Sequence, residues 1–143
     1  MRLLRLIVLF YAGMVAKQPG VPHAELAIQA ATAMEQSEPL FQDDRLSVAV
    51  VLATMLEESS FRTGIDGDGG SSHGVMQLWG KPGLSVIENV QGGIEQLRIS
   101  FNTCHDAPYA AYLAGPRGCK VPRVRRLSRH REATTVQILA GLP

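Results

Sequence analysis

Glu58 is the residue of this sequence that is best placed for acid–base chemistry. It follows an apolar run, residues 47–56, whose length, alanine and methionine content and lack of strict alternation predict a buried helix. Helical spacing puts Met55 and Glu58 on one face, so the carboxyl emerges from an apolar wall. Because burial disfavours the charged form, such a carboxyl can keep a proton near neutral pH and donate it. Met55, Met76 and Tyr112 are expected to supply the apolar surround.

Two segments further along the chain carry polar and aromatic side chains that could line a binding groove. The first, Gly74–Leu78 with Trp79 directly after it, follows a glycine- and aspartate-rich stretch, residues 64–72, that predicts a loop. The second, Ala111–Gly115, contains Tyr112. Aromatic side chains with a polar tip occur at binding surfaces, and packing in a core is their alternative role.

Taken in order, Glu58-Ser59, Gly74–Leu78 and Ala111–Gly115 resemble the motifs of the soluble lytic transglycosylases, a family with the lysozyme-like fold. The resemblance covers residues 45 to 116, the middle of the chain. It implies that Glu58 is the catalytic glutamate, because this residue stands directly before the serine of the Glu-Ser motif. Glu57 is then only a neighbour of the catalytic residue.

The same resemblance implies which residues bind the glycan. Gln77 would line the sugar groove, Trp79 would face the cleft and stack on a sugar ring, and the Tyr112 hydroxyl would approach the catalytic carboxyl. Met76 belongs to the motif that Gln77 closes, and we expect it at the substrate as well. Residues 89–93 look like the family's structural segment at the start of a helix.

Some positions depart from the family pattern and concern the choice of substrate. Leu113 replaces the asparagine of the family's tyrosine motif, which removes an amide beside the site. Asp66 and Asp68 stand where the family commonly has a serine that contacts substrate, and Ser71 or Ser72 could substitute for that serine. We include Ser72 among the expected substrate-binding residues.

The chemistry that the resemblance implies needs one carboxyl group and no cofactor. Glu58 would protonate the oxygen of the β-1,4 bond between N-acetylmuramic acid and N-acetylglucosamine in peptidoglycan. The N-acetyl group of the substrate would stabilise the developing cation, as in substrate-assisted enzymes. Glu58 would then remove the proton of the C6 hydroxyl, which leaves a 1,6-anhydro sugar. Glycan strands are thus the expected partner.

Two alternatives remain open at this point. A muramidase of the goose-lysozyme kind would hydrolyse the same bond, with Asp66 or Asp68 positioning water. A non-catalytic module that binds the cell wall would use the basic stretch near the C-terminus, which holds seven of the fourteen lysines and arginines, from Arg117 to Arg131. The favoured interpretation of that stretch is a solvated helix face, and we expect no nucleic acid to bind.

Metal binding is not expected. Residues 66–70 resemble part of a calcium loop, but the glutamate that should follow is absent, where Val75 or Met76 would fall. Turns made by aspartate side chains explain this stretch better. No cluster of cysteine and histidine suggests a zinc site, and His73 has no role in the proposed chemistry.

The ends of the chain and its cysteines bear on localisation. Met1–Arg5 is basic and Leu6–Ala16 is apolar, so residues 1–16 are either a signal-like segment or a buried first helix. The run is too short to span a membrane stably. Cys104 and Cys119 could form a disulfide in an exported protein, and reduced thiols in the cytosol are the alternative. We expect a periplasmic or extracellular protein, with a phage origin also open.

The expected fold is mainly α, lysozyme-like, with a substrate groove between the Glu58 helix and the segments carrying Gln77 and Tyr112. With 143 residues, 45% of them hydrophobic, the chain suits one domain, and residues 17–143 are assigned to it as a catalytic domain. We expect a monomer. Further helices are predicted over residues 24–34, 86–101 and 107–113 and from 121 onward, with a small hairpin within residues 64–78.

Overall fold

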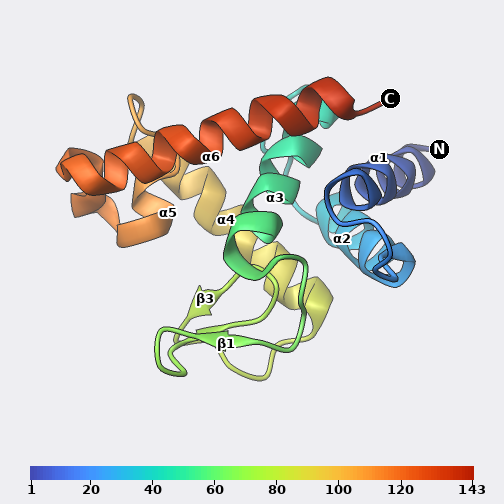
Figure 1. The fold of residues 1–143 in the computed structure, drawn as a ribbon, viewed down its shortest axis with the longest axis horizontal. Helices are drawn as coiled ribbons and strands as arrows, with labels where there is room; N and C mark the ends of the chain where they lie inside the picture. Colours follow the sequence, from blue (N-terminus) through green and yellow to red (C-terminus); the bar gives the residue numbers. More distant parts are fainter.

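A computed structural model describes residues 1–143 and is mainly helical, with one small antiparallel sheet (Figure 1). The six α-helices are α1 (Arg2–Lys17), α2 (Ala24–Gln36), α3 (Asp44–Ser59), α4 (Val86–Thr103), α5 (Ala110–Ala114) and α6 (Pro122–Gly141). The 3-10 helix η1 covers Pro116–Lys120, and the strands are β1 (Asp66–Gly67), β2 (Ser72–His73) and β3 (Leu78–Trp79). None of the helices combines the length and the apolar character needed to cross a membrane.

Helix α3 lies at the centre of the molecule, with the other helices arranged around it (Figure 1). Its residues from Ser47 to Met55 are all buried, as the apolar run in the sequence predicts. A helix that is apolar on every side needs neighbours on every side, which here are α1 and α6 among others. Asp43 begins α3, because its carboxylate accepts a hydrogen bond from the Arg45 backbone N–H at 2.8 Å.

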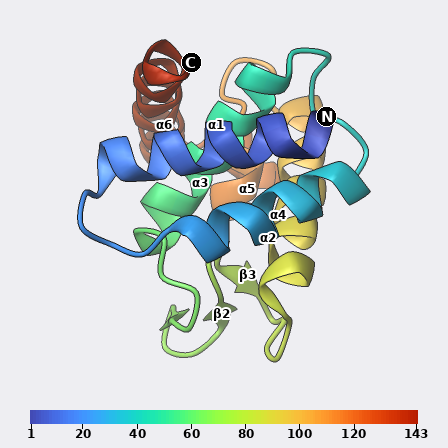
Figure 2. The ribbon, with the colours of Figure 1, turned by 90° about the vertical axis from the view of Figure 1, so that its right-hand side faces the viewer.

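Helix α1 packs into the core, so the apolar run at the start of the chain is the first helix of this fold. Leu6, Phe10 and Met14 are fully buried, and Gly13 lies against the Leu52 side chain of α3. Figure 2 shows α1 and α2 side by side across one face of the molecule. The opposite side of α1 stays exposed, as Leu4 illustrates.

The sheet follows α3 directly and contains the hairpin that the sequence predicts, with one strand more. The strand order is β1-β2-β3 and both pairings are antiparallel, with Gly67 opposite Ser72 and Ser72 opposite Trp79. Asp68 stands in the turn between β1 and β2 with a positive φ of 51°, a conformation that aspartate tolerates better than most residues. Its carboxylate accepts a hydrogen bond from the Ser72 hydroxyl at 2.5 Å.

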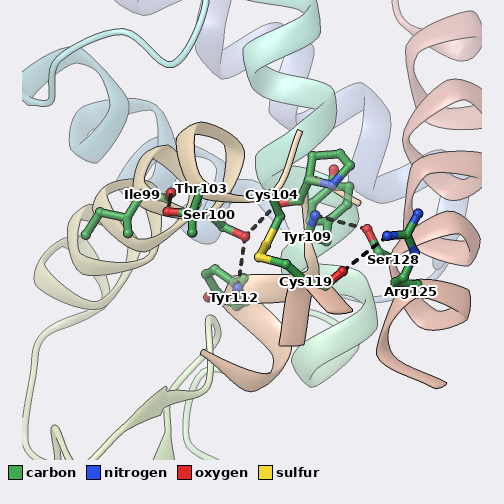
Figure 3. Close-up of a disulfide and its surroundings, with 10 residues drawn as sticks. Ile99, Ser100, Thr103, Cys104, Tyr109, Tyr112, Cys119, Arg125 and Ser128 are labelled. Atoms are coloured by element: carbon green, nitrogen blue, oxygen red, sulfur yellow. Dashed lines mark hydrogen bonds between the residues drawn. A yellow bond between two sulfur atoms is a disulfide. The ribbon is translucent and has the colours of Figure 1, made fainter. Parts of the chain in front are cut away.

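The last part of the chain returns over α3 and closes the molecule. A disulfide joins Cys104, at the end of α4, to Cys119 in η1, and so encloses α5 (Figure 3). Helix α5 begins at Ala110, somewhat later than the sequence predicts, because turns occupy the residues before it. Helix α6 then packs against α3, and Ile138 and Leu142 near its end are buried in the core.

Candidate active site

Glu58 opens into a cleft of about 570 Å³ that is lined by residues of α3, β2, β3, α4 and α5 and of the loops beside the strands and after α5. Helix α3 supplies Glu58, the sheet region supplies polar and aromatic side chains, and α4 and α5 supply the opposite wall. The lining residues are Glu58, Asp68, Ser72, Gln77, Leu78, Trp79, Lys81, Gln96, Tyr112, Leu113, Ala114 and Gly115. A cleft of this size with converging polar groups is the usual form of a ligand site.

The Glu58 carboxyl stands in the last turn of α3 and is 19% exposed. Its Oε1 atom accepts a hydrogen bond from Nη1 of Arg131, in α6, at 2.8 Å. The sequence predicts a purely apolar surround for this carboxyl, and the structure instead places a buried guanidinium against it. Tyr112 lines the same cleft, and burial of the phenol, followed by the charge of Glu58, raises the Tyr112 pKa.

The chain turns sharply after Glu58, and Ser59 fixes that turn. The Ser59 hydroxyl lies 2.8 Å from the Val75 carbonyl oxygen and 2.9 Å from the Met55 carbonyl oxygen, so it can donate to either. Ser60 and Phe61 follow with φ values of 52° and 63°, in the left-handed region that non-glycine residues seldom adopt. The serine after the glutamate therefore ties the end of α3 to the Gly74–Leu78 segment.

The segment around Met76 is held by side chains from α4. Asn89 accepts a hydrogen bond from the Met76 backbone N–H and donates one to the His73 carbonyl, both at 2.9 Å. A side chain at Gly93 would collide with Met76, so glycine is needed there. Met76 itself is fully buried and does not line the cleft. We expected it at the substrate, and its side chain belongs to the core instead because it fills the space over Gly93.

Gln77 lines the cleft and also braces the loop that leads into it. Its side-chain amide donates hydrogen bonds to the carbonyl oxygens of Gly74, at 2.8 Å, and Ile65, at 3.1 Å. Its backbone has a positive φ of 49°, and strand β3 begins at the next residue. The glutamine therefore shapes the groove wall, and both hydrogen atoms of its amide are already engaged.

Tyr112 joins α5 to the same wall of the cleft. Its hydroxyl donates a hydrogen bond to the Met76 carbonyl oxygen at 2.6 Å, and its backbone N–H donates to the Ser100 hydroxyl at 2.9 Å. Burial of the phenol, followed by the negative charge of Glu58, holds the Tyr112 pKa well above its usual value. The hydroxyl therefore stays protonated and remains a donor.

Ser72 and Trp79 lie opposite each other in the sheet, and both line the cleft. The Ser72 side chain is buried and bonded to Asp68, whereas Trp79 is 76% exposed and offers its indole to solvent. Lys81 and Gln96 complete the polar lining, and sequence reasoning did not single out either of them. The indole is therefore free to pack against a molecule in the cleft.

The remaining candidates lie elsewhere. His73 points to Asp66, with Nδ1 2.7 Å from the carboxylate, and neither residue lines the cleft with Glu58. No group of three histidine, cysteine or acidic side chains is placed to hold a metal ion. Cys104 and Cys119 support the α5 region from outside the cleft (Figure 3).

Arg131 is the residue that sequence reasoning missed. It was grouped with the basic stretch, whose other arginines and lysines are exposed or half-buried, yet Arg131 is only 6% exposed. The sequence does contain a pattern that could have placed Arg131 on a buried helix face. Helical spacing puts it on one face with Ser128, Thr135 and Ile138. Three of these four residues are polar, so hydrophobic periodicity alone does not reveal that face.

Comparisons of this chain with models of protein families, with curated proteins and with solved structures found no match.

Proposed function

We propose that this protein is a lytic transglycosylase of the lysozyme-like kind, which cleaves peptidoglycan strands with Glu58 as its single acid and base. The observation that carries the proposal is the meeting of Glu58, Gln77, Trp79 and Tyr112 in one cleft. These residues come from three separate segments of the chain. They are the residues that the resemblance to soluble lytic transglycosylases assigns to the site.

In the proposed reaction, Glu58 gives its proton to the oxygen between N-acetylmuramic acid and N-acetylglucosamine, and the C1–O bond breaks. The N-acetyl carbonyl of the muramic sugar stabilises the cation at C1. Glu58, now a carboxylate, removes the proton of the C6 hydroxyl, and the C6 oxygen bonds to C1. No water is consumed and the carboxyl is again protonated. Trp79 stacks on a sugar ring, and Gln77 shapes the wall of the cleft along which the strand lies.

Hydrolysis of the same bond is the second candidate, and Asp68 favours it. This carboxylate lines the cleft that holds Glu58, and only one of its oxygens is bonded to Ser72. A second carboxylate could activate a water molecule at the opposite face of the sugar, as inverting glycosidases require. The product would then carry a reducing end in place of the anhydro ring.

The site also suggests where the protein works. Peptidoglycan lies in the cell envelope, so the proposed activity belongs in the periplasm or outside the cell. The disulfide between Cys104 and Cys119 is of the kind that persists in such oxidising compartments.

Mass spectrometry of the products released from purified peptidoglycan tests the proposal. We expect anhydromuropeptides from the wild type and a loss of at least about 100-fold in Glu58→Gln, because the variant cannot donate a proton. Glu57→Gln is the matched control, since Glu57 faces Thr134 of α6 and does not line the cleft. Reducing-end products would favour the hydrolase. Binding to the wall without any product would reject both reactions and favour a wall-binding module.

A further inference from the structure

We propose that Arg131 is a positioning residue for Glu58, which holds one carboxylate oxygen so that the other transfers the proton. This inference rests on the proposed function, because it concerns the same carboxyl group. Helix α6 contributes no residue to the lining of the cleft. The proposal gives this helix a role in catalysis through Arg131.

The contact between Arg131 and Glu58 is sheltered from solvent. The two side chains are 7% and 19% exposed, and Nη1 lies 2.8 Å from Oε1. Arg129, two residues earlier on α6, is exposed, and its charge acts on Glu132 of the same helix. An arginine is costly to bury unless it is paired, so its place beside this carboxylate is specific to the site.

Arg131 is itself held in position by Tyr109. Its guanidinium carbon lies 5.6 Å from the centre of the Tyr109 ring, within the range of a cation–π contact. The Tyr109 hydroxyl lies 2.6 Å from Thr135 Oγ1, and the Tyr109 backbone N–H donates to the Ser128 hydroxyl at 3.0 Å. Burial raises the Tyr109 pKa to about 12, so the phenol is neutral and does not compete with Glu58 for the guanidinium.

Helix α6 also holds the neighbouring acid. The Thr134 hydroxyl donates to Glu57 Oε1 at 3.0 Å, three residues along the helix from Arg131. Both acids at the end of α3 are therefore bonded from one face of α6, which resists rotation of that helix end. The orientation of Glu58 is set by α3 and α6 together.

The consequence is a carboxyl group with one restrained oxygen and one free oxygen. Oε1 is bonded to Arg131, and Oε2 accepts no hydrogen bond from the protein. A group that must donate a proton and then remove another needs its reactive oxygen in one place throughout, and misplacement by about 1 Å can cost 100-fold in rate. The guanidinium also compensates the charge that Glu58 carries after it donates the proton.

Steady-state kinetics on soluble, uncrosslinked glycan strands test the proposal with Arg131→Met, Arg131→Lys and the control Arg129→Met. We expect kcat to fall about 100-fold in Arg131→Met with KM changed less than about threefold, because binding is kept and orientation is lost. Arg131→Lys keeps the charge without the planar group and should lie between, about 10-fold below wild type. Arg129→Met should match wild type.

A loss of folding is distinguished from a loss of activity by measuring the Tm of each variant and assaying all of them well below the lowest Tm. If Arg131→Met does not fold, Arg131→Lys alone decides the matter through its kcat. A wild-type kcat in whichever Arg131 variants fold, or a rise in KM that accounts for the whole loss, overturns the positioning role while the proposed function stands. A wild type that forms no product, with Glu58→Gln indistinguishable from it, defeats the proposed function itself.

Discussion

At the scale of single residues, the motif side chains of this protein hold one another as much as they face the cleft. Ser59 reaches the Val75 carbonyl, Tyr112 reaches the Met76 carbonyl, and Asn89 binds the Met76 backbone N–H. Three elements thereby meet on one short stretch of backbone beside Glu58. The stretch has little freedom to move, because each bond fixes it from a different direction.

Removing the Tyr112 hydroxyl should therefore cost stability as well as activity. Tyr112→Phe leaves the Met76 carbonyl oxygen without its partner, which is expected to lower the free energy of unfolding by about 1–3 kcal/mol. Urea unfolding measures the change. Tyr11→Phe is the control, because Tyr11 is 46% exposed and bonds to nothing. Equal stability of the two variants would mean that the hydroxyl contributes nothing to the fold.

The sequence identifies several of the residues that line the candidate cleft but not all of their contacts. Glu58, Gln77 and Tyr112 were named from motifs, and Trp79 and Ser72 from their places near those motifs, and the five residues line one cleft. A motif contains the residue types that recur around a site, so it identifies candidate residues but gives no distances between them. Motifs do not reveal a contact such as that between Glu58 and Arg131, whose partners stand 73 positions apart.

At the scale of elements, prediction succeeded where the buried face is apolar. Helix α4 was predicted from the spacing of Ile87, Val90, Ile94 and Leu97, of which the last three are buried and Ile87 is half-buried. Helix α6 was predicted only as a closing helix, and its buried face towards α3 carries Ser128, Arg131, Thr134 and Thr135. Polar residues become buried there because they find partners on α3 and around Tyr109, and a single sequence does not show those partners.

The start of α4 offers a test at this scale, because Ser85 and Glu88 form a capping box. The Ser85 hydroxyl accepts from the Glu88 N–H at 3.2 Å, and the Glu88 carboxylate accepts from the Ser85 N–H at 2.8 Å. The Ser85 backbone N–H, and then the Ser85 hydroxyl, act on the Glu88 carboxyl and hold its pKa below the usual value of 4.5. Ser85→Ala should destabilise the protein by about 1 kcal/mol at pH 7.

The capping box also predicts a pH dependence. A carboxyl whose pKa is lowered by folding stabilises the protein above its unfolded value, and the stabilisation is lost as pH falls through the folded value. The difference in unfolding free energy between wild type and Glu88→Ala should therefore be present at pH 7 and shrink below about pH 4.5. Denaturation at several pH values measures it, and a difference that grew in acid would contradict the assignment.

At the scale of the whole molecule, the cleft is built from segments that lie far apart in the sequence. The end of α3, the sheet region, α4 and α5 all contribute residues to its lining. Helix α5 is short, so it depends on its surroundings, which include the disulfide and the hydrogen bonds of Tyr109 and Tyr112 to Ser128 and Ser100 (Figure 3). The position of Tyr112 in the cleft therefore depends on the disulfide and on these hydrogen bonds.

Loss of the disulfide should accordingly weaken both the fold and the cleft. The bond joins cysteines 15 positions apart, and a loop of that length is stabilised by about 3 kcal/mol through the restricted unfolded chain. The double variant Cys104→Ala/Cys119→Ala should unfold at lower urea concentration by that amount, and reducing agent should no longer affect it. Wild type kept in reducing agent should match the double variant. If activity below the unfolding transition were unchanged in both, the disulfide would serve stability alone, and α5 would hold Tyr112 through its hydrogen bonds without help.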